Sequence, residues 1–201
     1  MHLNLRLLLL TWALTTPLAH AATVSVQLQD ATGKPLPEGV VFLESSQAKQ
    51  LAKPIAGAEI AQANKQFAPR VLVVPVGTAV SFPNRDTVRH HVYSFSPIKP
   101  FELKLYTGTS ASPVVFDKPG IAVLGCNIHD SMTAWVVVVE TPFFALSDAN
   151  GATTLRNVPA GNYRLRIWHS GLSVGAPAAE QAISVGTTDV SMVYRLAGVT
   201  P

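Results

Sequence analysis

Three side chains that bind soft metals stand at even spacing in the segment 125–132. Cys126, His129 and Met132 bring a thiol, an imidazole and a thioether at intervals of three residues. A type 1, or blue, copper site consists of two imidazoles and one thiolate in a near-trigonal plane, with a weak axial thioether. One loop between two strands can supply the Cys, the His and the Met. The second imidazole must come from another strand, because so short a loop cannot encircle a metal.

A candidate for that second imidazole lies about 35 residues upstream. The segment 84–91 contains Asn84-x-Asp86-x3-His90 and is followed directly by His91. Neighbouring residues of a strand point to opposite faces, so His90 and His91 cannot both bind one metal without distortion. The two histidines are therefore rival ligands. The upstream segment, the Cys-x2-His-x2-Met element and a Val-rich strand after it form a far more specific pattern than any one of them.

The first 21 residues have the composition of an export signal. Arg6 precedes an apolar run at 7–14, and the small-x-small sequence Ala19-His20-Ala21 follows. The run is much shorter than the ~20 residues that span a bilayer. We therefore expect cleavage after Ala21, a periplasmic location and no transmembrane segment in the remaining chain. An uncleaved N-terminal anchor is the alternative.

The charge of the chain argues against one class of partner, and its single cysteine needs an explanation. Without residues 1–21 the basic residues fall by Arg6 alone to 14, against 12 acidic residues, a formal charge of +2. This mild charge, with no cluster of Lys and Arg, argues against a nucleic-acid partner. The chain has one Cys, so no internal disulfide can form, although exported proteins meet oxidising conditions. Burial, a bridge to another chain or a metal would explain Cys126.

Short strands and turns dominate the pattern after the signal. The segments 24–28 and 163–168 alternate with the period of two that half-buried strands show, and Gly and Pro separate the apolar runs. We expect the remaining strands at 40–43, 70–74, 79–82, 90–95, 114–116, 121–124, 135–140, 179–185 and 190–194. Residues 45–54 indicate a polar linker, 157–161 a turn, and only 55–65 admits a helix. The pattern predicts an all-β protein with sandwich or barrel layers.

Two further segments complete a likeness to a known family. They are 74–84 (VPVGTAVSFPN), a Gly-turned hairpin before the first histidine, and 116–120 (FDKPG), the turn that leads into the Cys-bearing strand. With these, residues 55–141 resemble a cupredoxin of the amicyanin or plastocyanin type. The chain after residue 21 resembles bacterial exported proteins often labelled methylamine utilisation protein, although no residue supports a role in methylamine chemistry. The resemblance implies a Greek-key β-sandwich or barrel that binds one type 1 copper.

The resemblance also implies a ligand set and a route for electrons. His90 falls where the family places its first ligand, so His90, Cys126, His129 and Met132 are the implied metal ligands. His91 takes the position of an Asn that braces the ligand loop in the family. In cupredoxins the His of the ligand loop reaches the surface through an apolar patch and passes electrons there. By this likeness His129 is the electron port, with Ile128 and Pro97 as members of the patch.

Two segments outside 55–141 resemble another module. The stretch 26–43, which contains Asp30-x2-Gly33-Lys34, resembles the first two strands of carboxypeptidase-regulatory-like sandwiches, and 148–168 resembles the middle of that module. The opening strands of the cupredoxin already lie within 55–82. We therefore predict one discontinuous small β-sandwich, residues 22–50 plus 142–199, into which the cupredoxin domain 55–141 is inserted. Inserted domains are tolerated where the ends of the insertion lie close together.

Electron transfer without substrate turnover is the function these features favour. The expected partner is a redox protein such as a cytochrome or a dehydrogenase. Copper storage, delivery or sensing with the same ligands is the alternative. Multicopper oxidases need extra His-rich copper sites, commonly His-x-His pairs, and after residue 21 the chain contains only His90, His91, His129 and His169. An oxidase is therefore rejected, and we expect no enzyme activity.

Overall fold

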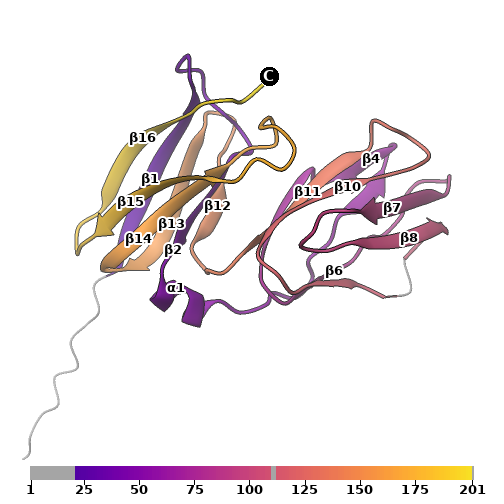
Figure 1. The fold of residues 1–201 in the computed structure, drawn as a ribbon, viewed down its shortest axis with the longest axis horizontal. Coiled ribbons are helices and arrows are strands. Elements are labelled where there is room, and N and C mark those ends of the chain that lie inside the picture. Colours follow the sequence, from indigo (N-terminus) through magenta and orange to yellow (C-terminus); the bar gives the residue numbers. More distant parts are fainter. Residues whose placement is uncertain (1–20, 110–111, 201) are drawn as a thin grey trace, which may run out of the picture.

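The computed structural model describes residues 21–109 and 112–200 and is almost entirely β (Figure 1). The predicted all-β class is therefore confirmed. Apart from Ala21, the residues of the expected export signal lie outside the described part of the chain. Within that part, no helix has the length and apolar character needed to cross a bilayer.

One group of strands, here called the split sandwich, comes from both ends of the described chain. A three-stranded sheet has the order β13-β1-β16, and a four-stranded sheet has the order β12-β2-β14-β15. β1 pairs antiparallel with β13 and parallel with β16, so the first strand lies between two of the last ones. The strands are β1 (Ala21–Asp30), β2 (Val40–Glu44), β12 (Phe144–Leu146), β13 (Ala152–Pro159), β14 (Gly161–Trp168), β15 (Ala179–Val185) and β16 (Val190–Leu196).

The core between these two sheets is apolar and follows from strand alternation. Val24, Val26 and Leu28 of β1 are fully buried, while the residues between them face outward. Leu165 and Ile167 of β14 reach the same core from the opposite sheet. Burying alternate residues of each strand gives the sandwich one continuous hydrophobic layer.

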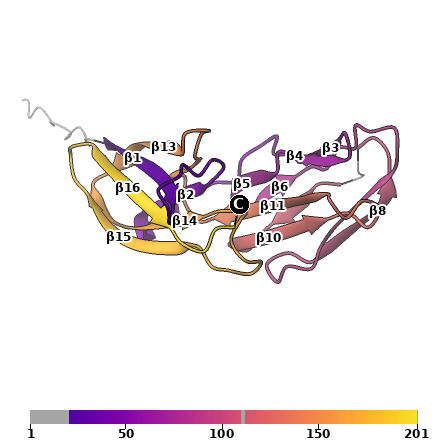
Figure 2. The same ribbon diagram turned by 90° about the horizontal axis from the view of Figure 1, so that it is seen from above.

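The second group, here called the central unit, comprises the strands that lie between β2 and β12 in the sequence. Its main sheet has five strands in the order β5-β11-β10-β7-β8, and two small sheets, β3-β4 and β6-β9, complete it. Figure 2 shows the central unit beside the split sandwich along the long axis of the molecule. The strands are β3 (Ala61–Ala63), β4 (Gln66–Ala68), β5 (Val71–Pro75), β6 (Thr78–Val80), β7 (His90–Ser94), β8 (Phe101–Tyr106), β9 (Val114–Phe116), β10 (Gly120–Gly125) and β11 (Thr133–Val139).

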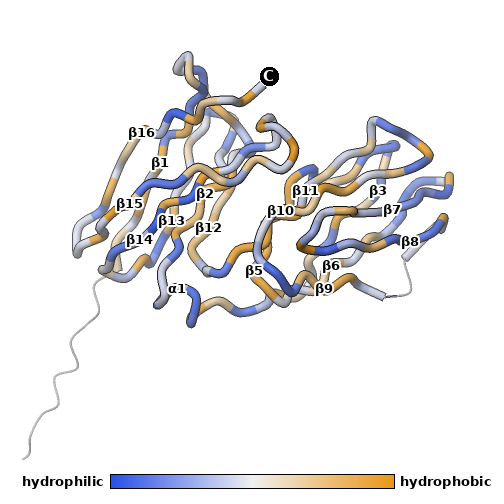
Figure 3. Tube along the Cα trace, in the orientation of Figure 1, coloured by the Kyte–Doolittle hydropathy of each residue, from blue (hydrophilic) through white to orange (hydrophobic). Residues whose placement is uncertain are grey.

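Strand β11 is buried on both faces and joins the two groups. Ala134, Val136 and Val138 point into the core of the central unit. The residues between them, Trp135, Val137 and Val139, pack against Val40, Phe42 and Trp168 of the split sandwich. A strand covered on both sides has an unbroken apolar sequence, which is why this strand is Val-rich. Hydrophobic stretches accordingly lie on strands of both groups in Figure 3.

Local structure differs from the sequence expectation in several places, and strands β8, β12 and β13 form where no strand was expected. The expected linker 45–54 contains a helix, α1 (Ser46–Leu51), whose N-cap Ser45 accepts a hydrogen bond from the Ala48 N–H. No helix forms over 55–65, where β3 begins instead. The expected turn at 157–161 is shorter than predicted, since β13 runs to Pro159 and β14 begins at Gly161. Asn157 has a left-handed conformation (φ 57°) beside a register shift in the β1–β13 pairing, as at a β-bulge, and an Asn tolerates that conformation better than most residues.

Candidate metal centre

Two neighbouring strands and one loop bring three candidate ligands together. His90 begins β7, Cys126 directly follows β10, and His129 lies in the loop between β10 and β11. Strands β7 and β10 pair through Tyr93 and Gly125, next to the cysteine. The pairing of β7 with β8 shifts register between His90 and Val92, and such bulges re-aim side chains near functional sites.

The three side chains form a compact donor cluster. One ligand atom from each of His90, Cys126 and His129 lies within 4.8 Å of the other two. The Nδ1 of His90 is 3.9 Å from the Sγ of Cys126, and the two imidazole rings have their centroids 5.1 Å apart. His90 is fully buried and Cys126 nearly so, whereas His129 is partly exposed. Two nitrogens and one sulfur therefore face a common point beneath the surface.

The hydrogen-bond partners of the candidate ligand atoms show whether these residues fit a metal. The Nδ1 of His129 is buried without a hydrogen-bond partner, and a buried polar atom with no partner is costly. The Sγ of Cys126 accepts a hydrogen bond from the Ile128 N–H at 3.4 Å, as suits a thiolate. Two imidazoles with one thiolate are the donor set of a type 1 copper site. The residues present fit that metal.

Met132 lies close by, at the far end of the ligand loop. Its N–H donates to the carbonyl of His129 at 3.0 Å, which closes the loop with a tight turn. Its side chain is 1% exposed and belongs to the same core cluster as Cys126. The thioether is therefore buried in the core that also contains Cys126.

His91 is not part of the donor cluster. Its Nε2 pairs with a carboxylate oxygen of Glu102 on β8 at 2.8 Å, and its ring packs against Tyr93. Its Nδ1 is buried without a partner. The structure thus brings His90, and not its neighbour, to Cys126 and His129, as expected when adjacent strand residues face opposite ways.

Asp86 touches the site, a role that the sequence analysis did not assign. A carboxylate oxygen of Asp86 lies 2.7 Å from the Nε2 of His90. The backbone N–H of Lys65, together with the bonds from His90 and Asn64, lowers the pKa of Asp86 below its usual 3.8. Asp86 is therefore ionised at neutral pH. The spacing of four residues before His90 was the one signal that could have pointed to this contact.

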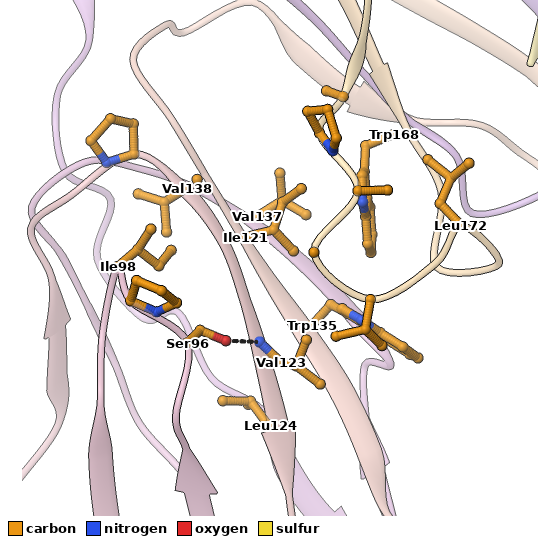
Figure 4. A pocket seen from close by; sticks show the side chains of 18 of the residues that line it. Ser96, Ile98, Ile121, Val123, Leu124, Trp135, Val137, Val138, Trp168 and Leu172 are labelled. Atoms are coloured by element: carbon orange, nitrogen blue, oxygen red, sulfur yellow. Dashed lines mark hydrogen bonds between the residues drawn. The ribbon is translucent and has the colours of Figure 1, made fainter.

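A cavity of about 910 Å³ lies between the central unit and the split sandwich. Figure 4 shows Trp135, Ile121 and Val137 on one side, with Trp168 and Leu172 on the other. Gly125 and Tyr93 also line the cavity, but His90, Cys126 and His129 do not. The cavity therefore borders the strand that leads to the cysteine without opening onto the donor cluster.

Comparisons with solved structures give likenesses to copper proteins at low identity. A Cu-containing nitrite reductase from Thermus scotoductus SA-01 is 28% identical, with a TM-score of 0.39, over 44% of this chain and 26% of its own. A purple cupredoxin from Nitrosopumilus maritimus is 24% identical, with a TM-score of 0.37, over 41% of this chain and 99% of its own. A reduced Cu(I) form of an amicyanin variant is 20% identical, with a TM-score of 0.39, over 49% of this chain and 98% of its own.

None of these likenesses covers half of the chain, and none reaches a TM-score of 0.5. No protein-family model matches the sequence, and neither does any curated protein. The roles of individual residues therefore follow from the side chains of the site.

Proposed function

We propose that this protein holds one type 1 copper ion between His90, Cys126 and His129 and carries single electrons between redox partners. The observation that supports it most is the donor cluster itself. A thiol and two imidazoles lie within 4.8 Å of one another, and two of the three side chains are buried. When bound, copper accepts and releases one electron. No second donor cluster of this kind occurs among the residues that the structure describes.

Each ligand has a role that follows from its chemistry. Cys126 as thiolate couples most strongly to the metal, and the ring nitrogens of His90 and His129 complete the plane. Met132 is the weak axial ligand that tunes the potential. His90 and Cys126 are held by neighbouring strands inside a packed core, which resists deformation. A rigid, buried site favours electron exchange, whereas copper delivery requires the ligands to release the ion.

The surface near His129 is the proposed point of electron exchange. His129 is the one partly exposed member of the cluster, and next to it Ile128 is 49% exposed. Pro97, the other expected member of the patch, is also exposed, but its neighbours Ser96 and Ile98 lie against Val123 and Gly120 of β10, so it sits toward the end of that strand away from Cys126 and is not part of this surface. An apolar surface at the ligand loop lets a redox protein, such as a cytochrome or a dehydrogenase, approach the metal closely. Export to the periplasm through residues 1–21 is part of the proposal.

The roles proposed for the two parts of the chain are supported by the strand pairing. Residues 55–141 form the copper-binding domain, and residues 22–50 with 142–199 form the small sandwich that carries it. Strand β1 pairs with β13 and β16, and β2 pairs with β12 and β14. The shared cluster around Trp135 and Trp168 holds the two parts together. The sandwich therefore acts as a support that orients the copper domain.

The test is an optical titration of the protein with Cu(II), with Cys126→Ser as the matched variant. We expect an intense visible thiolate-to-copper band that saturates at one copper per chain and is lost in the variant. The serine is nearly isosteric, so the folded domain should remain. A colourless wild type, or a variant that stays blue, would contradict the assignment. A blue protein whose copper cannot be cycled reversibly by voltammetry would favour storage, delivery or sensing over electron transfer.

A further inference from the structure

The carboxylate of Asp86 occupies a built position beside His90. Its Oδ1 accepts the Asn64 N–H at 2.6 Å, and its Oδ2 accepts the Lys65 N–H at 2.9 Å. The same Oδ2 lies 2.7 Å from the Nε2 of His90. Because a carboxylate is only an acceptor, that nitrogen must carry the proton. In the neutral imidazole the Nδ1 of His90, which faces Cys126, then has a free lone pair for a metal.

A strained hairpin presents the two backbone donors to Asp86. Asn64 and Lys65 form the two-residue turn between β3 and β4, and both have left-handed conformations (φ 54° and 58°). Gly and Asn favour such turns, and a Lys there is unusual. Both N–H groups of the turn point at one carboxylate. A turn far from His90 in sequence therefore fixes the group behind the first ligand.

A second side chain holds Asp86 in place from within its own loop. The Oδ1 of Asn84 accepts the Asp86 N–H at 2.9 Å. Its Nδ2 donates to the carbonyls of Val88 and Tyr106 at 2.9 and 2.7 Å. Asn84 is 5% exposed. The segment from Asn84 to His90 is therefore braced on both sides of the aspartate.

The neighbouring histidine supplies an internal comparison. The Nε2 of His91 also pairs with a carboxylate, that of Glu102, at 2.8 Å. The side chain of Glu102 is 55% exposed, whereas that of Asp86 is 15% exposed. His91 is outside the donor cluster. Glu102 thus places a carboxylate close by without touching the donor cluster of His90, Cys126 and His129.

We propose that Asp86 is a positioning residue that fixes the ring and tautomer of His90 and lowers the reduction potential of the bound copper. A negatively charged acceptor makes an imidazole a stronger donor, and the partner behind a ligating His contributes to metal affinity. A stronger, more negative donor set stabilises Cu(II) more than Cu(I). The inference rests on the proposed function, because it concerns the copper held by His90.

The test compares Asp86→Asn with Glu102→Gln in the full chain loaded with copper. Each substitution removes one negative charge. For Asp86→Asn we expect the ratio of Cu(II) to Cu(I) affinity to fall about tenfold, which raises the reduction potential by about 59 mV for a one-electron couple. For Glu102→Gln we expect less than a third of that shift. Equal shifts in the two variants, or no shift in Asp86→Asn, would overturn the inference.

A second measurement does not depend on how Asp86→Asn folds. Nitrogen-15 NMR of the metal-free wild type should show His90 protonated at Nε2 and unprotonated at Nδ1. The opposite tautomer would overturn the role of Asp86 even if the protein binds copper. A wild type that gives no thiolate-to-copper band would instead contradict the proposed function, and the inference with it. A blue wild type with no difference between the variants would refute the inference alone.

Discussion

The two parts of the molecule bury different kinds of polar side chain. In the split sandwich, the buried polar residues described are Ser147 and Thr153, and both hydroxyls donate to backbone carbonyls. In the central unit, buried imidazoles and amides are present as well, including His90, His91 and Gln62. Three of the four buried polar atoms without a partner among the described residues lie there, on Gln62, His91 and His129.

This difference suggests that the split sandwich is a structural support, whereas the central unit contains the functional site. Hydroxyls that bond to nearby carbonyls cost little and leave the sandwich core apolar. Imidazoles in a core cost free energy unless their nitrogens find partners, and proteins tolerate such conflicts mainly at functional sites. Substituting equivalent residues in the two cores tests this difference, when the free energy of unfolding and the visible copper band are measured separately.

The largest expected effect comes from truncating one leucine in each core. Leu165 in the split sandwich and Leu124 in the central unit are both fully buried. Each Leu→Ala change should reduce the free energy of unfolding by about 2–5 kcal/mol. Leu124→Ala should also shift the visible copper band, because Leu124 shares the core cluster of Cys126. Chemical denaturation and optical spectra measure both, and a band that shifts only in Leu165→Ala would reverse the comparison.

A smaller effect is expected at the surface shared by the two parts. Val137 is 2% exposed and packs in the cluster that joins them. Val137→Ala should cost about 1.5 kcal/mol, from two lost methyl groups at about 0.8 kcal/mol each, and should separate the two parts' unfolding in calorimetry. Val193→Ala, at a residue 59% exposed, is the control and should change stability by less than about 0.5 kcal/mol. A cost as small as that of the control would show that the parts are not coupled here.

The smallest expected effect is a pH dependence in the split sandwich. His169 lies in a neutral arrangement, since its Nε2 donates to the Pro37 carbonyl and its Nδ1 accepts the Gly171 N–H. Burial lowers the pKa of His169 below 6.5. Below about pH 6.5, His169 therefore binds a proton more readily in the unfolded chain than in the folded one. The free energy of unfolding should fall as the pH decreases through this range.

The control for that pH dependence is His169→Gln, measured by denaturation at several pH values between 7 and 5. The variant should lose part of the slope that the wild type shows. The carboxylates whose pKa is lowered, Asp30, Asp86 and Asp117, contribute stability that is lost only below about 3.8, outside this range. An unchanged slope in the variant would show that His169 is not the group responsible.

Much of the architecture was predictable because strand alternation and turn residues are local signals. The period of two at Val24–Leu28 and the Val-rich run at 136–139 correspond to β1 and β11. The even spacing of Cys126, His129 and Met132 placed three candidate ligands in one loop. The opposite facing of adjacent strand residues made His90 and His91 rivals, and the structure places only His90 in the donor cluster.

The remainder depended on contacts that local patterns do not encode. Helix α1 begins at an N-cap hydrogen bond at Ser45 within a segment that is mostly polar. The hairpin of Asn64 and Lys65 has strands of only three residues each, and its turn is held by Asp86, more than 20 residues away. The contact between Asp86 and His90 depends on the loop braced by Asn84. Such long-range polar contacts appear only once the strands are assembled.

The most direct measurement is a crystal structure of the copper-loaded protein with anomalous diffraction at the copper edge. We predict a single anomalous peak bounded by the Nδ1 of His90, the Sγ of Cys126 and a ring nitrogen of His129, with the thioether of Met132 at a longer distance. A peak at His91 and Glu102 instead, or no peak within bonding distance of Cys126, would contradict the assignment of the metal centre.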